Sequence, residues 1–264
     1  MITGWKRSLA ALVVVLWPTS LAAAPAGDLD LMYEIHIGGL FMGTLRVHTS
    51  IGGGAYHLRS DLRTAGLVGW LTGFTSLAVS DGVLAADGPR PSAHRADNQW
   101  RGDKRWSEQR YRAGLPAVGT LFPSQSDDER KPVPPEQTIG TVDPLTAGLA
   151  LSAVAGSGTA EPRIIPVFDG RRRYDLIATP EAAETITAPA YAGLAQVVDV
   201  SMRRIAGFSP SPFFPPPKEG DKARLWFVPA PPGGLPHHGV PVRMRSDGPL
   251  GMVVVNLVRL PSTD

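Results

Sequence analysis

The sequence predicts a mainly β protein built on a single antiparallel, strongly curved sheet, either an open barrel or a β-spiral, with one packed α-helix near residues 143–155. Apolar and polar residues alternate with a period of two over many short stretches, as in strands with one buried face. Turn-forming pairs separate these stretches, and the chain contains 29 Gly and 26 Pro. A hydrophobic content of 43% supports a buried core rather than disorder.

The N-terminus resembles a secretory signal peptide, predicted over residues 1–24 with cleavage between 22 and 26. Lys6 and Arg7 precede an apolar run, Leu9–Trp17, and small residues follow at Ala22–Ala24. The run is too short for an ordinary membrane span, so we expect no transmembrane segment in the mature chain. The alternative is an uncleaved interfacial anchor. No linker or repeat divides the rest, which predicts a single β domain over residues 27–260.

Composition excludes several classes of chemistry. The chain has no cysteine, which removes disulfides, thiolate nucleophiles and Cys-ligated metals. Its 26 Lys and Arg nearly balance 24 Asp and Glu, and two of the cations leave with the predicted signal peptide. A mature chain without excess positive charge gives no indication of nucleic-acid binding.

The first strands form hairpins. Residues 29–49 alternate on both sides of Gly38-Gly39, which predicts a hairpin turn there. Gly52–Gly54 predicts the next turn. Further strands are expected over Tyr56–Leu62 and Leu77–Leu84.

The strand pattern stops at Ala65–Phe74, where apolar residues fall at helical spacing. We expect one or two helical turns that cover an open edge of the sheet. The segment is interpreted either as a core plug or as a lid over an apolar pocket, and a membrane-touching tip is a further alternative. The candidate lid residues are Leu67, Trp70, Leu71 and Phe74.

A long polar stretch follows at His94–Arg112, with Gly102-Asp103 as the expected turn of a hairpin. Trp100, Arg105 and Trp106 are candidate contacts for a partner or an anion, because cationic and aromatic side chains alternate here. The competing interpretation is a solvated β face on which arginines stack. Three acidic residues dilute the charge and argue against nucleic acid.

The stretch Asp143–Ala155 carries the sequence features that predict an α-helix. Asp143 can cap the first turn, and Pro144 fits the first helical position, where no N–H is required. An apolar stripe predicts packing on or inside the curved sheet, and Gly156 can end the helix.

Ile164–Ala178 predicts a hairpin around Asp169-Gly170, because both residues tolerate the backbone of tight turns. Arg171, Arg172 and Arg173 at this turn are either solvated or a contact for an anion or partner. Strands are further expected at Thr185–Ala188, Gln196–Ile205 and Lys222–Val228, followed by a closing hairpin, and Gly207–Pro217 is expected to be a rigid connector.

No catalytic or cofactor motif is present. The G-x-S-x-G, H-E-x-x-H and phosphate-loop patterns are absent. The acidic run at 127–129 lacks the spacing of a calcium loop, and His237-His238 has no third ligand at suitable spacing. We expect no enzyme activity, no metal and no cofactor.

Four elements together resemble a known family. These are V-D-P-L-T at Val142–Thr146, V-F-D-G-R-R-R-Y-D-L at Val167–Leu176, a closing pattern from Pro241 to Leu257, and Tyr33, Gly38 and Gly43 near the start. The chain resembles the bacterial Domain of Unknown Function 3108 family over residues 31 to 260. It is also similar in architecture to periplasmic β-spiral proteins that support envelope integrity, which usually carry a disulfide. The resemblance implies export to the periplasm and gives Asp143, Pro144, Asp169 and Gly170 as structural signature residues, with no catalytic residues.

The leading hypothesis is a non-catalytic periplasmic protein that binds a lipid-like or apolar envelope component or supports envelope integrity. The alternative is an interaction protein that docks another envelope protein through the basic-aromatic arm, Trp100–Arg112. A hydrolase is the third hypothesis.

Overall fold

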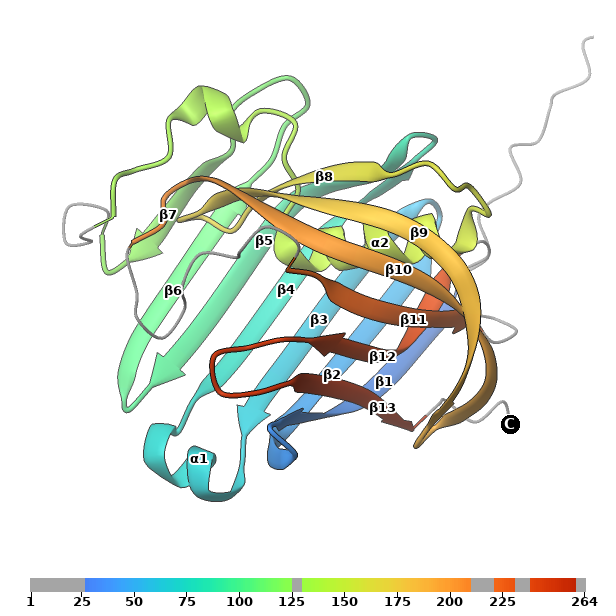
Figure 1. Ribbon diagram of the computed structural model, residues 1–264. Coiled ribbons are helices and arrows are strands. Elements are labelled where there is room, and N and C mark those ends of the chain that lie inside the picture. The colour runs from blue at the N-terminus through green and yellow to red at the C-terminus, as the bar shows by residue number, and fades with distance from the viewer. Residues whose placement is uncertain (1–26, 125–129, 210–220, 231–237, 260–264) are drawn as a thin grey trace, which may run out of the picture.

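The computed structural model describes residues 27–124, 130–209, 221–230 and 238–259, and in them thirteen strands form one antiparallel sheet (Figure 1). The N-terminal strands are β1 (Gly27–Ile37), β2 (Leu40–Gly52), β3 (Ala55–Thr64), β4 (Thr75–Ala85), β5 (Gly88–Trp100), β6 (Asp103–Arg110) and β7 (Val118–Phe122). The C-terminal strands are β8 (Arg163–Phe168), β9 (Arg173–Ala188), β10 (Tyr191–Ala206), β11 (Ala223–Pro229), β12 (Gly239–Ser246) and β13 (Val253–Arg259). The predicted fold class is confirmed.

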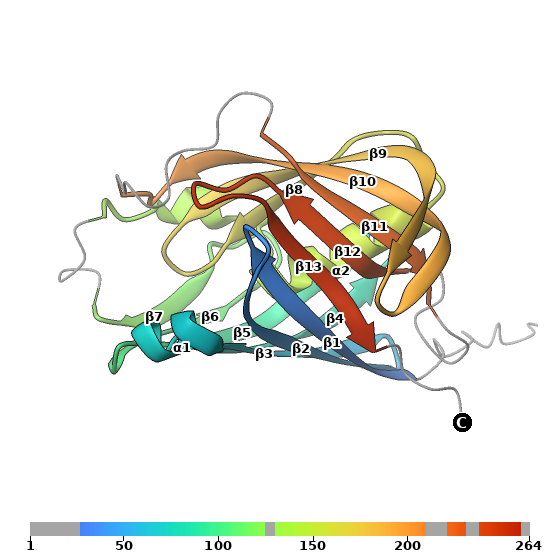
Figure 2. The same ribbon diagram turned by 60° about the horizontal axis from the view of Figure 1, so that its bottom comes forward.

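The order of the strands explains why the sheet stays open. It runs β7-β6-β5-β4-β3-β2-β1-β13-β12-β11-β10-β9-β8, so each half of the chain is a meander of adjacent hairpins. The halves join where β1 pairs with β13, as in Tyr33 opposite Leu257. Strands β7 and β8 follow each other in sequence but form the two outer edges. The sheet curls so that these edges approach one another (Figure 2).

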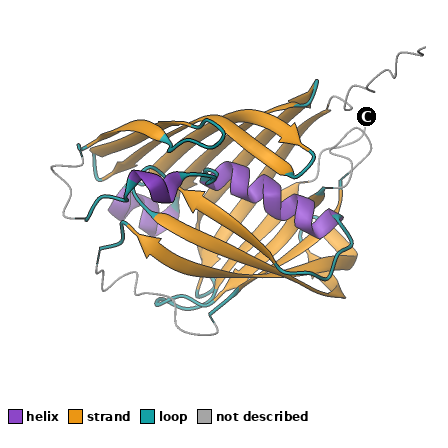
Figure 3. Ribbon diagram, turned by 90° about the horizontal axis from the view of Figure 1, so that it is seen from above, coloured by secondary structure: helices purple, strands orange, loops and turns teal. Residues whose placement is uncertain are grey.

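Helix α2 (Pro144–Gly156) connects the two edges in sequence and lies in the space that the sheet curls around (Figure 3). It contacts β3, β4 and β5 on one side and β8 to β12 on the other. Ala147, Leu151 and Val154 pack against β8, β9 and β10, whereas Leu149 packs near Tyr56 and Leu58 of β3. A helix that is apolar around most of its circumference suits burial between two walls.

The edge strand β8 is covered by the chain that leads into α2. Val142 forms a parallel bridge with Val167, and its N–H donates to the Pro166 carbonyl at 2.8 Å. Tyr111 Oη donates to the Phe168 carbonyl at 2.9 Å. These contacts satisfy an edge that would otherwise present free backbone groups.

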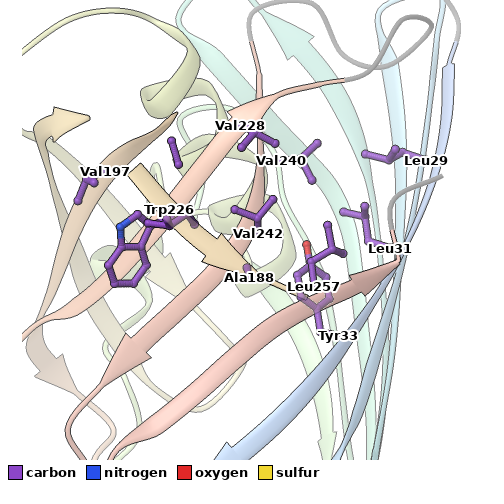
Figure 4. Close-up of a cluster of buried hydrophobic side chains, with 12 residues drawn as sticks. Leu29, Leu31, Tyr33, Ala188, Val197, Trp226, Val228, Val240, Val242 and Leu257 are labelled. Carbon is purple, nitrogen blue, oxygen red and sulfur yellow. The ribbon is translucent and has the colours of Figure 1, made fainter. Parts of the chain in front are cut away.

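The largest core cluster lies where the halves of the sheet meet (Figure 4). It is formed by buried side chains of β1 and of β9 to β13, including the β9–β10 hairpin. Trp226 donates from Nε1 to Glu184 Oε2 at 2.9 Å, so its polar group is paired although the ring is buried.

Two predictions about the elements need correction. Helix α1 (Gly66–Thr72) joins β3 to β4, which are central strands, so it does not cover an open edge of the sheet. The segment between Ala178 and Thr185 was not expected to be strand, yet β9 runs through it without interruption. Its pairing with β10 continues past Pro180, so tertiary pairing overrides the weak local preference.

Most predicted turns are confirmed. Hairpins lie at Gly38-Gly39 and at Asp169-Gly170 as predicted, whereas the turn predicted at Gly102-Asp103 lies one residue earlier, at Arg101-Gly102. A short 3₁₀ helix, η2 (Pro135–Thr138), precedes α2. Gly43 of the family signature has φ +153°, and a Cβ there would overlap the Arg63 carbonyl of β3. The signature glycine therefore permits a close approach of two strands. The predicted signal peptide and most of the proline-rich connector lie outside the described residues.

Candidate functional site

An apolar cavity of about 250 Å³ lies between α2 and the inner face of the sheet. Its walls come from β1, β2, β3, α2, β11, β12 and β13, together with Ala230 and His238 beside the start of β12. The apolar lining is formed by Leu29, Leu31, Tyr33, Leu45, Val47, Leu58, Leu145, Leu149, Leu225, Val240, Met244 and Val255.

Strand alternation explains the apolar wall. Leu29, Leu31 and Tyr33 occupy every second position of β1 and point inward together, as Figure 4 shows. Leu45 and Val47 do the same on β2, where Leu45 is paired with Tyr33. Each of the two strands therefore supplies a row of apolar side chains, and these two rows form one side of the cavity together with Leu58 of β3.

The helix forms the opposite wall, where small side chains lie beside Leu145 and Leu149. Pro144, Gly148 and Ser152 recur at intervals of four residues, which places them on one face of α2. A Cβ placed on Gly148 would meet no atom within 4 Å outside its own stretch of helix. Pro144 and Gly148 are exposed, so the cavity opens to solvent along this face of α2, where the side chains are small.

A few polar groups interrupt the lining. Thr49, Ser152 and His238 lie on the wall, and Tyr33 Oη donates to the Pro241 carbonyl at 3.0 Å. Burial raises the pKa of the Tyr33 hydroxyl well above its usual value, so it stays neutral. A mostly apolar cavity with few polar groups is the usual form of a site for an apolar small molecule.

The N-terminal end of α2 lies in a buried polar network centred on Asp143. Oδ1 accepts from the N–H groups of Leu145 and Thr146 at 2.9 and 3.0 Å, which caps the helix. Oδ2 accepts from Thr146 Oγ1 at 2.6 Å and from Ser80 Oγ at 2.7 Å. Tyr56 Oη lies 2.8 Å from Thr146 Oγ1 and extends the network to β3.

His94 completes this network on β5. Its Nδ1 lies 3.2 Å from Asp143 Oδ1, close enough for a polar contact. Burial by itself raises the pKa of Asp143, but the contacts with His94 and Thr146 outweigh it and hold that pKa below its usual value. Asp143 is therefore a buried carboxylate that its neighbours keep ionised.

The residue types Ser80, His94 and Asp143 match those of a hydrolytic triad, but their connections differ. In a triad the histidine lies between the serine and the acid and takes the proton from the serine. Here Ser80 Oγ donates directly to the Asp143 carboxylate, and both side chains are fully buried. The arrangement supports a structural role for the network.

The sequence interpretation identified Asp143 as a helix cap but missed Ser80, His94, Thr146 and Tyr56 as its partners. These residues come from β3, β4, β5 and α2, and no spacing in sequence links them. The available signal was the presence of Ser80 and His94 at inward-facing strand positions, opposite each other on β4 and β5.

The candidate lid residues lie away from the described cavity wall. Trp70 on α1 is 79% exposed, which does not fit a core plug. Phe74 packs against Trp100 of β5, with ring centroids 5.8 Å apart. The side chains of Leu67 and Leu71 lie outside what the structure describes. Since α1 follows β3 at the end of the sheet where β1 turns into β2, Trp70 and Phe74 belong to that end.

The basic-aromatic arm forms the hairpin β5–β6. Arg105 and Trp106 border an outer groove of about 530 Å³ across β3 to β6. Arg95 stacks over the Trp106 ring at 5.4 Å and pairs with Asp97, so arginine stacking on a solvated β face is observed here. Trp100 lies apart from the groove, near α1.

The arginine triplet is held within the fold. Asp169 Oδ1 accepts from the N–H groups of Arg171 and Arg172 and closes the turn that Gly170 makes with φ +92°. Arg171 Nη2 donates to the Pro123 carbonyl, Arg172 pairs with Asp169, and Arg173 pairs with buried Asp175. These bonds tie the turn to neighbouring segments, so the structure gives the triplet an internal role.

The described residues offer neither a metal site nor a membrane-spanning helix. Among the described residues, no group of three His, Asp or Glu side chains could hold a metal ion. Within the same part of the chain, no helix combines the length and the hydrophobicity that crossing a bilayer requires. Of the histidine pair, His238 lies at the cavity wall and His237 lies outside the described residues.

Comparisons with known proteins agree with the fold. A crystal structure of a beta-barrel-like protein of domain of unknown function DUF1849 from Brucella abortus is similar, with a TM-score of 0.53 and 12% identity. The similarity covers 91% of this chain and 99% of that chain. At this identity it shows a shared fold alone. No curated protein matches the sequence.

The family model described as Protein of unknown function (DUF3108) matches residues 32–258, which include the signature elements from Tyr33 to Leu257 and all of the cavity wall except Leu29 and Leu31. The resemblance stated from the sequence motifs is therefore confirmed, and the chain belongs to this family.

Proposed function

We propose that this protein is a non-catalytic binding protein of the bacterial periplasm and that its interior cavity takes an apolar, lipid-like ligand. The observation that supports the proposal is the cavity of about 250 Å³ beside Gly148, lined mainly by apolar side chains. The cavity opens to solvent, and apolar surface that water reaches gains free energy when a ligand covers it, so this concave apolar surface supports an apolar ligand.

The volume of the cavity limits the size of the ligand that it can hold. Apolar cavities of about 150 Å³ take up benzene, and pockets for drug-sized molecules begin near 300 Å³. A cavity of 250 Å³ suits a segment of an acyl chain or a compact ring system. The polar groups Thr49, Ser152 and His238 would orient the polar end of such a molecule.

Competition for an apolar fluorophore tests the proposal. The purified protein is titrated with N-phenyl-1-naphthylamine, and its fluorescence increase is expected to saturate with one probe per chain. Gly148→Phe places a ring in the unfilled space and is expected to weaken binding about tenfold or more, since it removes apolar contact area of the ligand. Gly148→Ala is the matched control, because one methyl group leaves most of the volume.

Folding of each variant is checked by circular dichroism, and Ser152→Leu provides a second way to fill the cavity. Binding that is equal in the wild type, Gly148→Phe and Ser152→Leu would show that the probe sits elsewhere and would refute the proposed site. Native mass spectrometry of protein purified from cells then identifies the bound component. Cell fractionation tests the periplasmic location.

Docking of another envelope protein on the outer groove is the second candidate. The groove of about 530 Å³ is lined by Arg59, Arg63, Lys104, Arg105 and Trp106, with Asp61 and Asp97 among them. Its mixed charges suit a polar protein surface better than a highly charged polymer. Crosslinking from Lys104 to one defined protein, lost in Trp106→Ala, would favour this candidate.

A further inference from the structure

Four turns at one end of the sheet carry exposed apolar side chains. They are the β1–β2 turn, helix α1, the β5–β6 turn and the β12–β13 turn, which lie toward the same end in Figures 1 and 2. We call this set the apolar rim. Leu250 is 74% exposed, Leu40 is 72% exposed and Trp70 is 79% exposed, and Phe41, Trp100 and Met252 are also exposed.

Backbone hydrogen bonds join these turns into one surface. Gly38 N–H donates to the Met252 carbonyl at 2.9 Å, which links the β1–β2 turn to the β12–β13 turn. Ala65 N–H donates to the Met42 carbonyl at 2.9 Å, and Arg101 N–H donates to the Thr72 carbonyl at 2.8 Å. The apolar side chains therefore belong to turns that are connected through the backbone.

The charge pattern of the rim is uneven. Ile37–Met42 and Thr64–Thr75 contain no charged residue, although both segments reach the surface. The β5–β6 turn next to them carries Arg101, Lys104 and Arg105 against one acid, Asp103, and the β12–β13 turn carries one acid, Asp247. An exposed apolar strip bordered by cations matches the two layers of an anionic membrane surface, which are apolar chains and negative headgroups.

The shape of the apolar rim favours a lipid bilayer over a rigid protein as its binding partner. Side chains that are more than 70% exposed project almost fully from the fold, and a rigid protein partner would need a separate pocket for each. A fluid bilayer needs no such pockets. Tryptophan also prefers the boundary between headgroups and chains, where its ring and its N–H are both satisfied.

We propose that the apolar rim docks the protein on an anionic lipid bilayer, with Leu40, Trp70 and Leu250 entering the interface and Lys104 and Arg105 contacting the headgroups. This inference does not depend on the proposed cavity, because the rim and the described cavity wall share no residue. It assigns a docking role to the end of the sheet that bears α1.

Vesicle cosedimentation tests the proposal. The same full chain is used for all variants, so that residues 1–26 contribute equally to each measurement. Wild type is expected to bind vesicles of equal parts phosphatidylcholine and phosphatidylglycerol more strongly than vesicles of phosphatidylcholine alone. Leu40→Ser and Trp70→Ser are each expected to weaken partitioning about tenfold, since each removes the burial of a large apolar side chain.

Lys104→Ser is expected to weaken binding about fivefold, and only to the vesicles that contain phosphatidylglycerol. Leu194→Ser is the matched control, because Leu194 is 63% exposed but lies near the β9–β10 turn at the opposite end of the sheet. Fluorescence quenching by lipids brominated in their acyl chains should decrease in Trp70→Phe.

Three outcomes would overturn the proposal. These are rim variants that bind vesicles as tightly as the wild type, a Leu194→Ser variant that loses as much binding as Leu40→Ser, and lipid-free dimers that Leu40→Ser dissociates. The last result would assign the rim to a second copy of the chain.

Discussion

Helix α2 meets two different environments, a hydrogen-bonded polar network at its N-terminal end and an apolar cavity along its Gly148 face. In the network, the Asp143 carboxylate accepts four hydrogen bonds at defined angles, which fixes the position of the helix. Along the cavity the contacts are apolar and non-directional. The difference indicates that the polar end holds the helix in register while the other face can remain partly unfilled.

The largest expected effect comes from breaking the polar end. Asp143→Ala removes the helix cap and leaves Ser80 and Thr146 without their acceptor, so we expect a loss of about 3–5 kcal/mol in the free energy of unfolding. Urea unfolding measures it. Asp143→Asn keeps one capping oxygen and should lose less. A loss below about 1 kcal/mol in Asp143→Ala would show that the network does not position the helix.

Lowering the pH should weaken the Asp143 network and the buried ion pairs, which depend on ionised carboxylates, more than the apolar contacts along the cavity. Burial raises the pKa values of Asp143 and Asp175, but their hydrogen-bonding partners outweigh it and leave both below the usual value. Hydrogen bonds from Arg224 lower the pKa of Asp199, against a smaller effect of burial. The unfolded chain therefore binds more protons near pH 4, and the free energy of unfolding should fall as pH drops below about 5.

Urea midpoints between neutral pH and pH 3 test this dependence. The slope against pH should be smaller in Asp143→Asn, because one of the carboxylates with a lowered pKa is gone. An equal slope in the wild type and the variant would exclude Asp143 as a source of the dependence.

A smaller effect is expected at the edge of the network. Tyr56→Phe removes the hydroxyl that contacts Thr146 Oγ1 but keeps the buried ring, so we expect a loss of about 1 kcal/mol. Thermal unfolding measures it. In the double variant with Asp143→Ala, the cost of Tyr56→Phe should differ from its cost in the wild type, since the two residues share Thr146 as a partner.

The last prediction compares the same substitution, Gly to Ala, at an open position of α2 and at a tightly packed position of β4. Gly148→Ala should stabilise the protein by up to about 1 kcal/mol, because the helix gains propensity and the new methyl group enters open space. Gly82→Ala on β4 should destabilise it, since the Cβ would overlap Tyr56 Oη and the Arg90 carbonyl. Thermal shifts of the same sign for both variants would contradict the contrast between a filled and an unfilled side.

Much of the fold was predictable from local patterns. The alternation in β1 and β2 and the Gly38-Gly39 turn predict the first hairpin, and Asp143-Pro144 predicts the start of α2. β9 was predicted in two pieces because Pro180–Glu184 lacks β-branched residues, and its pairing with β10 makes it one strand. The candidate site was less predictable, since the proposed lid residues lie at the far end of the sheet from Ala230 and His238 of the cavity wall.

The sequence by itself determined the inward and outward faces of the strands, the turns that join them and the capped start of the helix, because these depend on residues that are close in the chain. Only the tertiary structure decided which faces oppose one another. The pairing of β1 with β13 joins the two halves into one open sheet that curls around α2. Packing of α2 against β4 and β5 brings Ser80, His94 and Asp143 together at one end of the helix, and a cavity remains beside Gly148. Alternation predicts that a side chain points inward, but packing between distant segments decides whether it meets a partner or open space.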